Sequence, residues 1–108
     1  MRNVLISELY RITAQENDVI DITLADETHP IFMAHFEGNP LLPAFLQIDI
    51  LADILNLEVV EITRSKFMEP VRPKDTIRYT VVKDESRSLL KVKLSKDDKQ
   101  VSEFTLVA

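Results

Sequence analysis

The residues best suited to acid–base chemistry in this chain are His35 and Asp49, which lie 14 positions apart. His35 falls in an irregular segment between Pro30 and Pro40, and a histidine there can act as a general base near neutral pH. Asp49 interrupts an apolar run, and burial would raise the pKa of its carboxyl. Two plainer interpretations stay open: a loop histidine is often just a polar residue, and one helix face can simply meet solvent.

Asp49 belongs to the segment AFLQIDILADILN, which predicts a helix directly after Pro43. Proline suits the first turn, where its missing N–H has no helical partner to lose. Asp53 follows Asp49 by four positions, so we expect both carboxylates on one face, where repulsion raises the pKa of at least one. Apolar residues cover nearly the whole remaining circumference, which is typical of a buried helix. These are Phe45, Leu46, Ile48, Ile50, Leu51, Ile54 and Leu55.

The rest of the chain predicts strands that can wrap this helix. We expect strands at 18–24, 57–67, 76–83, 89–95 and 101–107, several of them with apolar and polar residues alternating. The opening segment, 4–14, fits either a strand or a helix. The order predicts an α+β fold, an antiparallel sheet wrapped around one central helix. Because so small a sheet leaves part of an apolar helix uncovered, we expect a dimer.

Length and composition narrow the class of protein. A chain of 108 residues predicts a single domain, 1–108, and a net charge of −5 argues against a nucleic-acid partner. No apolar run is long enough for a membrane span, and Glu8 and Arg11 interrupt the region that a secretory signal would keep apolar. A cytoplasmic location is therefore expected. Without cysteine or a recognised ligand spacing, neither a metal nor a cofactor is expected.

The segment HFEGNPLLPAFLQID resembles the signature of the FabA/FabZ-type 3-hydroxyacyl-[acyl-carrier-protein] dehydratases, approximately H-F-x-G-x-P-x-x-P-G-x-L-x-x-(D/E). The matching residues are His35, Phe36, Gly38, Pro40, Pro43, Leu46 and Asp49. Upstream, PIF at 30–32 resembles the family's EPFF, and KFMEPVRPKD at 66–75 is similar to its KFRRPVVPGD. In size the chain is closer to the small ApeI-like thioester dehydratases.

This resemblance implies the hotdog fold and a homodimer whose active sites lie at the subunit interface. It implies a hydro-lyase of fatty acid biosynthesis or related lipid metabolism, which dehydrates a 3-hydroxyacyl thioester to the trans-2-enoyl thioester. His35 would remove the C2 proton as base, and Asp49 of the other subunit would protonate the departing 3-hydroxyl as acid.

The resemblance also assigns substrate-binding residues, namely Phe36, Gly38, Pro43 and Ala44. The Ala44 N–H at the helix start would bind the thioester carbonyl, beside an apolar tunnel for the acyl chain. Three positions depart from the family: Ala44 replaces a glycine, Asp53 stands where a glutamine is frequent, and Glu37 follows the histidine in place of a proline or apolar residue.

The expected partner is an acyl-carrier protein or coenzyme A carrying the thioester. Carrier proteins are acidic, so the basic residues Arg64, Lys66, Arg72 and Lys74 are candidates for carrier docking, although a solvated face explains them too. Two other functions stay open on the same fold. One is an acyl thioesterase, and the other is a non-catalytic module that binds acyl groups or a carrier.

Overall fold

The computed structural model describes residues 8–34, 38 and 40–108, which form one antiparallel sheet and two helices. The strands are β1 (Tyr10–Glu16), β2 (Val19–Leu24), β3 (Glu61–Phe67), β4 (Thr76–Asp84), β5 (Leu89–Lys96) and β6 (Lys99–Val107). The helices are α1 (Pro30–Ala34) and α2 (Ala44–Leu55), with a 3-10 turn at Glu85–Arg87. The order across the sheet is β1-β2-β4-β5-β6-β3. The predicted α+β architecture, an antiparallel sheet packed against one long helix, is therefore confirmed for the described residues.

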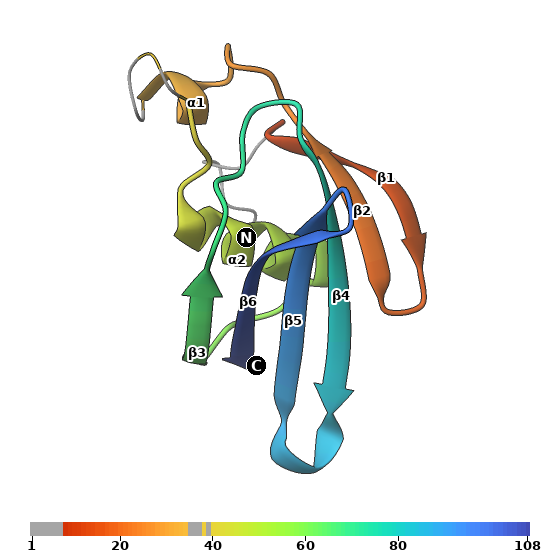
Figure 1. Ribbon diagram of the computed structural model, residues 1–108. Coiled ribbons are helices and arrows are strands. Elements are labelled where there is room, and N and C mark those ends of the chain that lie inside the picture. Colours follow the sequence, from red (N-terminus) through yellow and green to blue (C-terminus); the bar gives the residue numbers. More distant parts are fainter. Residues whose placement is uncertain (1–7, 35–37, 39) are drawn as a thin grey trace.

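The core lies between α2 and one face of the sheet. Figure 1 shows α2 running across the strands, with β3 at one edge and the β1–β2 hairpin curving away at the other. Alternate residues of each central strand point toward the helix, so that Ile77, Tyr79 and Val81 of β4 are buried while their neighbours are exposed. Leu46, Ile50 and Leu51 of α2 are likewise buried, each less than 2% exposed.

Short turns set the lengths of these elements. Asp97 and Asp98 both have positive φ and join β5 to β6, as a two-residue hairpin turn requires. Asn56 adopts the left-handed conformation after α2 and ends the helix there. The strand expected at 57–67 therefore begins later, at Glu61, because the Leu57 N–H still donates to the Ala52 carbonyl at the helix end.

The structure also settles the conformation of two segments near the N-terminus, 4–14 from residue 8 onward and the residues after His29. Within 4–14, the residues from Tyr10 onward are a strand. The prolines predicted an irregular segment after His29, but this segment contains a short helix, α1. His29 Nδ1 accepts a hydrogen bond from the Ile31 N–H and its carbonyl accepts one from the Phe32 N–H, so this histidine caps α1.

The sheet covers only part of α2, as expected for so small a sheet. Phe45 is 58% exposed, and Asp49 and Asp53 are only half-buried. The reason is that the sheet lies on one side of the helix, so the described residues leave the opposite side open. That open side carries the residues with candidate chemistry.

Candidate active site

The orientation of α2 is set by Gln47, a buried polar residue on the side that faces the sheet. Its Oε1 accepts a hydrogen bond from Ser102 Oγ of β6 at 2.7 Å, and its main-chain carbonyl accepts one from the Tyr79 hydroxyl of β4, also at 2.7 Å. Burial raises the pKa of Tyr79, as does the nearby Tyr10, so its hydroxyl remains a donor. Two strands therefore hold one point of the helix.

Asp49 lies on the open side of the helix. Two positions after Gln47 it has turned through about 200°, and the residue is half-buried. Burial raises the pKa of Asp49, which keeps a proton on the carboxyl at higher pH than is usual for aspartate. We expected burial and the nearby Asp53 to raise this pKa together, but among the described residues burial is the cause found and Asp53 does not contribute.

Asp53, one turn further along the same face, has a different environment. Its Oδ2 accepts a hydrogen bond of 2.5 Å from the hydroxyl of Tyr10, the first residue of β1. The carboxylate is thus directed toward the sheet edge. Asp53 has a tyrosine donor, whereas burial raises the pKa of Asp49, so the two acids of α2 are chemically distinct.

The first turn of α2 offers unpaired main-chain donors. Pro43 is the N-cap, in an extended conformation with φ −55 and ψ 137, and makes no side-chain cap hydrogen bond. The Leu46 N–H donates to the Pro43 carbonyl at 3.0 Å, whereas among the described residues the N–H groups of Ala44 and Phe45 have no helical acceptor and can bind an oxygen that carries negative charge. Ala44 is the first helical residue and is not among the residues with positive φ, so replacing the family's glycine there costs no backbone strain.

A groove of about 250 Å³ lies beside this helix start. Its lining combines the segment before α2 with the segment after β3, and a hydrogen bond of 2.7 Å from the Leu42 N–H to the Val71 carbonyl holds the two together. The lining residues are Leu41, Leu42, Pro43, Ala44, Gln47, Phe67, Met68, Glu69, Pro70 and Val71. Most are apolar, which suits an acyl group or the thioester end of its carrier arm.

The structure brings together only part of the predicted site. Pro43 and Ala44 line the groove, whereas Asp49 does not. Gly38 has φ +77 with open space where a Cβ would stand, so the backbone itself requires glycine there. His35 and Phe36 lie outside the described residues, as does Glu37.

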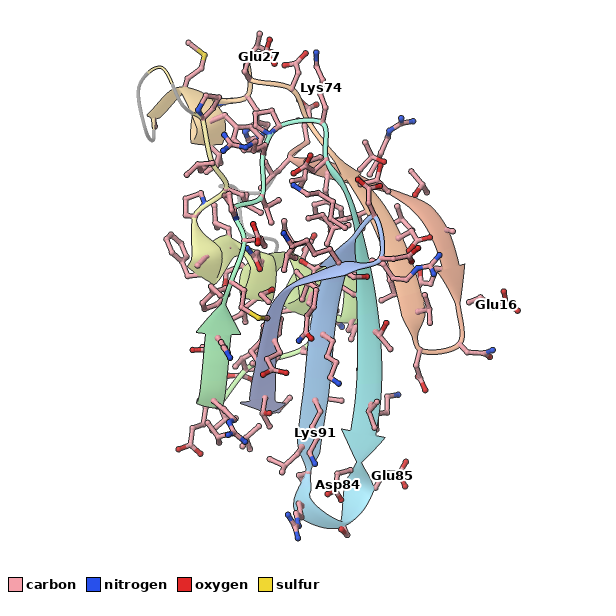
Figure 2. The ribbon with its side chains drawn as sticks, viewed as in Figure 1. Glu16, Glu27, Lys74, Asp84, Glu85 and Lys91 are labelled. Carbon is pink, nitrogen blue, oxygen red and sulfur yellow. The ribbon has the colours of Figure 1, made fainter. Side chains whose placement is uncertain are left out.

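The basic residues proposed for carrier docking lie on two consecutive segments, β3 and the link from β3 to β4. Arg64 and Lys66 of β3 are exposed and pair in register with Thr105 and Glu103 of β6. Lys74 lies in the link from β3 to β4, 4.0 Å from Glu27, and Figure 2 shows these two side chains near each other.

Arg72 and Arg78, which is in β4, are engaged by acids in different ways. The main-chain N–H of Arg72 donates to Asp75 Oδ2, and the Arg78 guanidinium makes two hydrogen bonds to Asp21. That ion pair lowers the pKa of Asp21. Arg78 therefore forms an ion pair between neighbouring strands of the sheet and is not counted among the docking candidates.

Two residues of the site carried little signal in the sequence. Gln47 could be noticed as the one amide within an apolar helix, but its partner Ser102 is 55 positions away. Tyr10 gave no sign of reaching Asp53. Within the described part of the chain, no group of three His, Cys, Asp or Glu side chains could hold a metal ion, and no helix is long and apolar enough to cross a bilayer.

The sequence is similar to a family of dehydratases and to individual members of it. A family described as ApeI-like, ApeI dehydratase, matches residues 11–105. The chain is 34% identical over 103 residues to the 3-hydroxyacyl-[acyl-carrier-protein] dehydratase FabZ of Fusobacterium nucleatum, covering 81% of this chain and 71% of that protein. It is 32% identical over 85 residues to FabZ of a Caulobacter species, strain K31, covering 65% of this chain and 52% of that protein. Against the Caulobacter relatives the chain spans about half of their length.

Solved structures agree with the fold. The dehydratase heterocomplex ApeI:P from Xenorhabdus doucetiae contains a chain with a TM-score of 0.73 and 25% identity, covering 90% of this chain and 92% of that one. A thioesterase family protein from Silicibacter pomeroyi has a TM-score of 0.59 at 16% identity, covering 97% of this chain and 87% of that one. The second likeness concerns the fold alone.

Proposed function

We propose that this chain, which belongs to the ApeI-like dehydratase family, removes water from 3-hydroxyacyl thioesters bound to an acyl-carrier protein. Membership makes it a hydro-lyase, and its FabZ relatives are named for this substrate class. In the reaction the C2–H bond breaks, its electron pair forms the C2–C3 double bond, and the C3–O bond breaks. The hydroxyl leaves as water with a proton from an acid.

The observation that carries the proposal is Asp49. A general acid must hold a proton near the working pH, and burial raises the pKa of this carboxyl toward that range. It lies on the open side of α2, where a substrate can approach. Asp53 on the same face already accepts the Tyr10 hydroxyl. Asp49 is therefore the better proton donor of the two.

The start of α2 supplies the second part of the mechanism. As the C2 proton leaves, negative charge develops on the thioester carbonyl oxygen. The Ala44 N–H and the helix dipole stabilise that charge, because both are already oriented before the reaction. The groove of about 250 Å³ would hold the thioester beside this N–H. His35 is the proposed base that takes the C2 proton.

Asp49 does not line the groove of its own chain, so we expect a second copy of the chain to complete each site. The seven residues of β3 are all exposed, and the described residues place no strand beyond it. An open strand edge is a template for pairing with another chain. Ile62, Phe67 and Met68 are large apolar residues exposed at this edge. A homodimer paired there would bury them.

The ApeI:P structure is a heterocomplex, so a related subunit is the other possible occupant of this edge. Mass measurement of the purified chain decides between them: a dimer supports the homodimer, and a monomer at micromolar concentration contradicts it.

The remaining proposals are docking of the carrier through Arg64, Lys66, Arg72 and Lys74, coenzyme A as an alternative carrier, and action in the cytoplasm.

The test is conversion of 3-hydroxyacyl-carrier protein to the enoyl product by wild type, Asp49→Asn and Asp53→Asn. The same substitution one turn apart on the same helix face gives a matched control. We expect Asp49→Asn to lower kcat about a hundredfold or more, the scale of a general acid, and Asp53→Asn to lower it far less. Wild type without product at any chain length or carrier would refute the dehydratase, and free thiol without enoyl product would indicate a thioesterase.

A further inference from the structure

Gln47 has one side-chain group that the fold does not use. The residue is 3% exposed, and its Oε1 is held by Ser102 Oγ. Across the described ranges, no hydrogen bond of its Nε2 is found, and no fully enclosed side-chain nitrogen or oxygen lacks a partner. Nε2 is therefore not enclosed, and its N–H groups point to open space. Such a donor is available to bind water or a substrate oxygen.

The open space is the groove at the start of α2, which Gln47 lines together with Ala44. Residues three apart on a helix are neighbours, and helical side chains lean toward the helix N-terminus. The amide of Gln47 therefore extends back toward the first turn. The neighbouring walls, formed by Leu42, Phe67 and Val71, are apolar. Gln47 is thus an isolated hydrogen-bond donor beside the main-chain donor of Ala44.

We propose that Gln47 Nε2 is a second hydrogen-bond donor to the thioester carbonyl oxygen of the substrate, acting together with the Ala44 N–H. The inference rests on the proposed function. A carbonyl oxygen accepts two hydrogen bonds, and an amide N–H can only donate, which matches an oxygen that gains negative charge during the reaction.

Ser102 and Tyr79 prepare this donor in advance. The Ser102 hydroxyl donates to Oε1, so the amide is oriented with its nitrogen away from β6. The Tyr79 hydroxyl fixes the main chain at the same residue. Donors that are already positioned need no reorganisation as charge develops, which is the property of an effective oxyanion site.

A purely structural role for Gln47 makes different predictions, and a pair of substitutions separates the two. Gln47→Met alone would leave the Ser102 hydroxyl without its acceptor. The double variant Gln47→Met/Ser102→Ala removes both polar partners, and such paired replacement is close to neutral for stability. Gln100→Met is the control, because Gln100 is an exposed glutamine on the same strand as Ser102.

Two measurements are made on each variant. The first is kcat and KM for dehydration. The second is the infrared carbonyl stretch of a trans-2-enoyl thioester labelled with carbon-13 at C1 and bound to the protein, which reports hydrogen bonding to that oxygen. We expect the double variant to lose about a hundredfold in kcat, the scale of one oxyanion donor, with a smaller change in KM. Its carbonyl stretch should move toward the value in water-free solvent, and Gln100→Met should match wild type.

An unchanged kcat together with an unchanged carbonyl stretch would overturn the inference. If the double variant does not fold, Gln47→Glu replaces it, because the carboxylate keeps an acceptor for Ser102 and has no N–H. The proposed function fails separately, through a wild type that makes no enoyl product. Even then the carbonyl stretch of the bound enoyl thioester reports whether Gln47 contacts that oxygen.

Discussion

Replacing Tyr79 with phenylalanine tests how α2 is held. The ring stays in place and only the hydroxyl is lost, together with its hydrogen bond of 2.7 Å to the Gln47 carbonyl. That carbonyl retains its hydrogen bond within the helix, so no acceptor is stranded. The expected cost is therefore one net hydrogen bond, about 1 kcal/mol in the free energy of unfolding.

The size of the thermal shift follows from the chain length. Unfolding entropy is about 2.1 cal/mol/K per residue, so for a chain of 108 residues about 1 kcal/mol lowers Tm by about 4 °C. Chemical denaturation with urea, at fixed protein concentration, measures the free energy, and differential scanning calorimetry measures Tm. Equal or greater stability of Tyr79→Phe would mean that apolar packing alone orients the helix, and the role given to Gln47 as an anchor would lose its support.

Three further outcomes are expected. Gly38→Ala should lower stability by about 1 kcal/mol because φ is +77 there, and Gly38→Asn by less, as urea unfolding will measure. Asp49→Asn should raise stability at neutral pH, because burial raises the pKa of Asp49 and the ionised carboxylate opposes folding. That gain in the free energy of unfolding should vanish below about pH 3.8, where this aspartate is protonated in both the folded and the unfolded protein. A gain that urea unfolding shows to be independent of pH would contradict this explanation. Arg72→Glu should raise KM for a carrier-protein substrate but not for a small thioester mimic, and equal effects on both would argue against docking.

Local patterns predicted the helix, most of the strands and the position of Asp49. Alternation in β4 and β5 reflects one face against the helix and one face in solvent, so it can be read from neighbouring residues. The continuous apolar run after Pro43 predicts a helix, and it too can be read from neighbouring residues. The motif around Gly38 and Asp49 added the family, which periodicity alone does not contain.

Long-range contacts were beyond such patterns. Tyr10 and Asp53 are 43 positions apart, and Gln47 and Ser102 are 55 apart. The residues around each of them therefore do not predict these hydrogen bonds. The sequence predicted that part of α2 would stay uncovered by its own sheet, but not that Phe45 would lie on the uncovered side. An apolar helix face predicts burial, and it does not say whether the covering surface comes from the same chain.

The most direct test of a site shared between two copies of the chain uses a mixed dimer of His35→Ala and Asp49→Asn, purified through different tags on the two subunits. Each parent homodimer lacks one catalytic group in both sites and should be inactive. In the mixed dimer one site has both substitutions and the other has neither. We predict turnover of 3-hydroxyacyl thioester at about half the wild-type rate per dimer, because one of two symmetric sites is restored. Turnover no higher than that of the parents, from a stable mixed dimer, would contradict a site built from His35 of one subunit and Asp49 of the other.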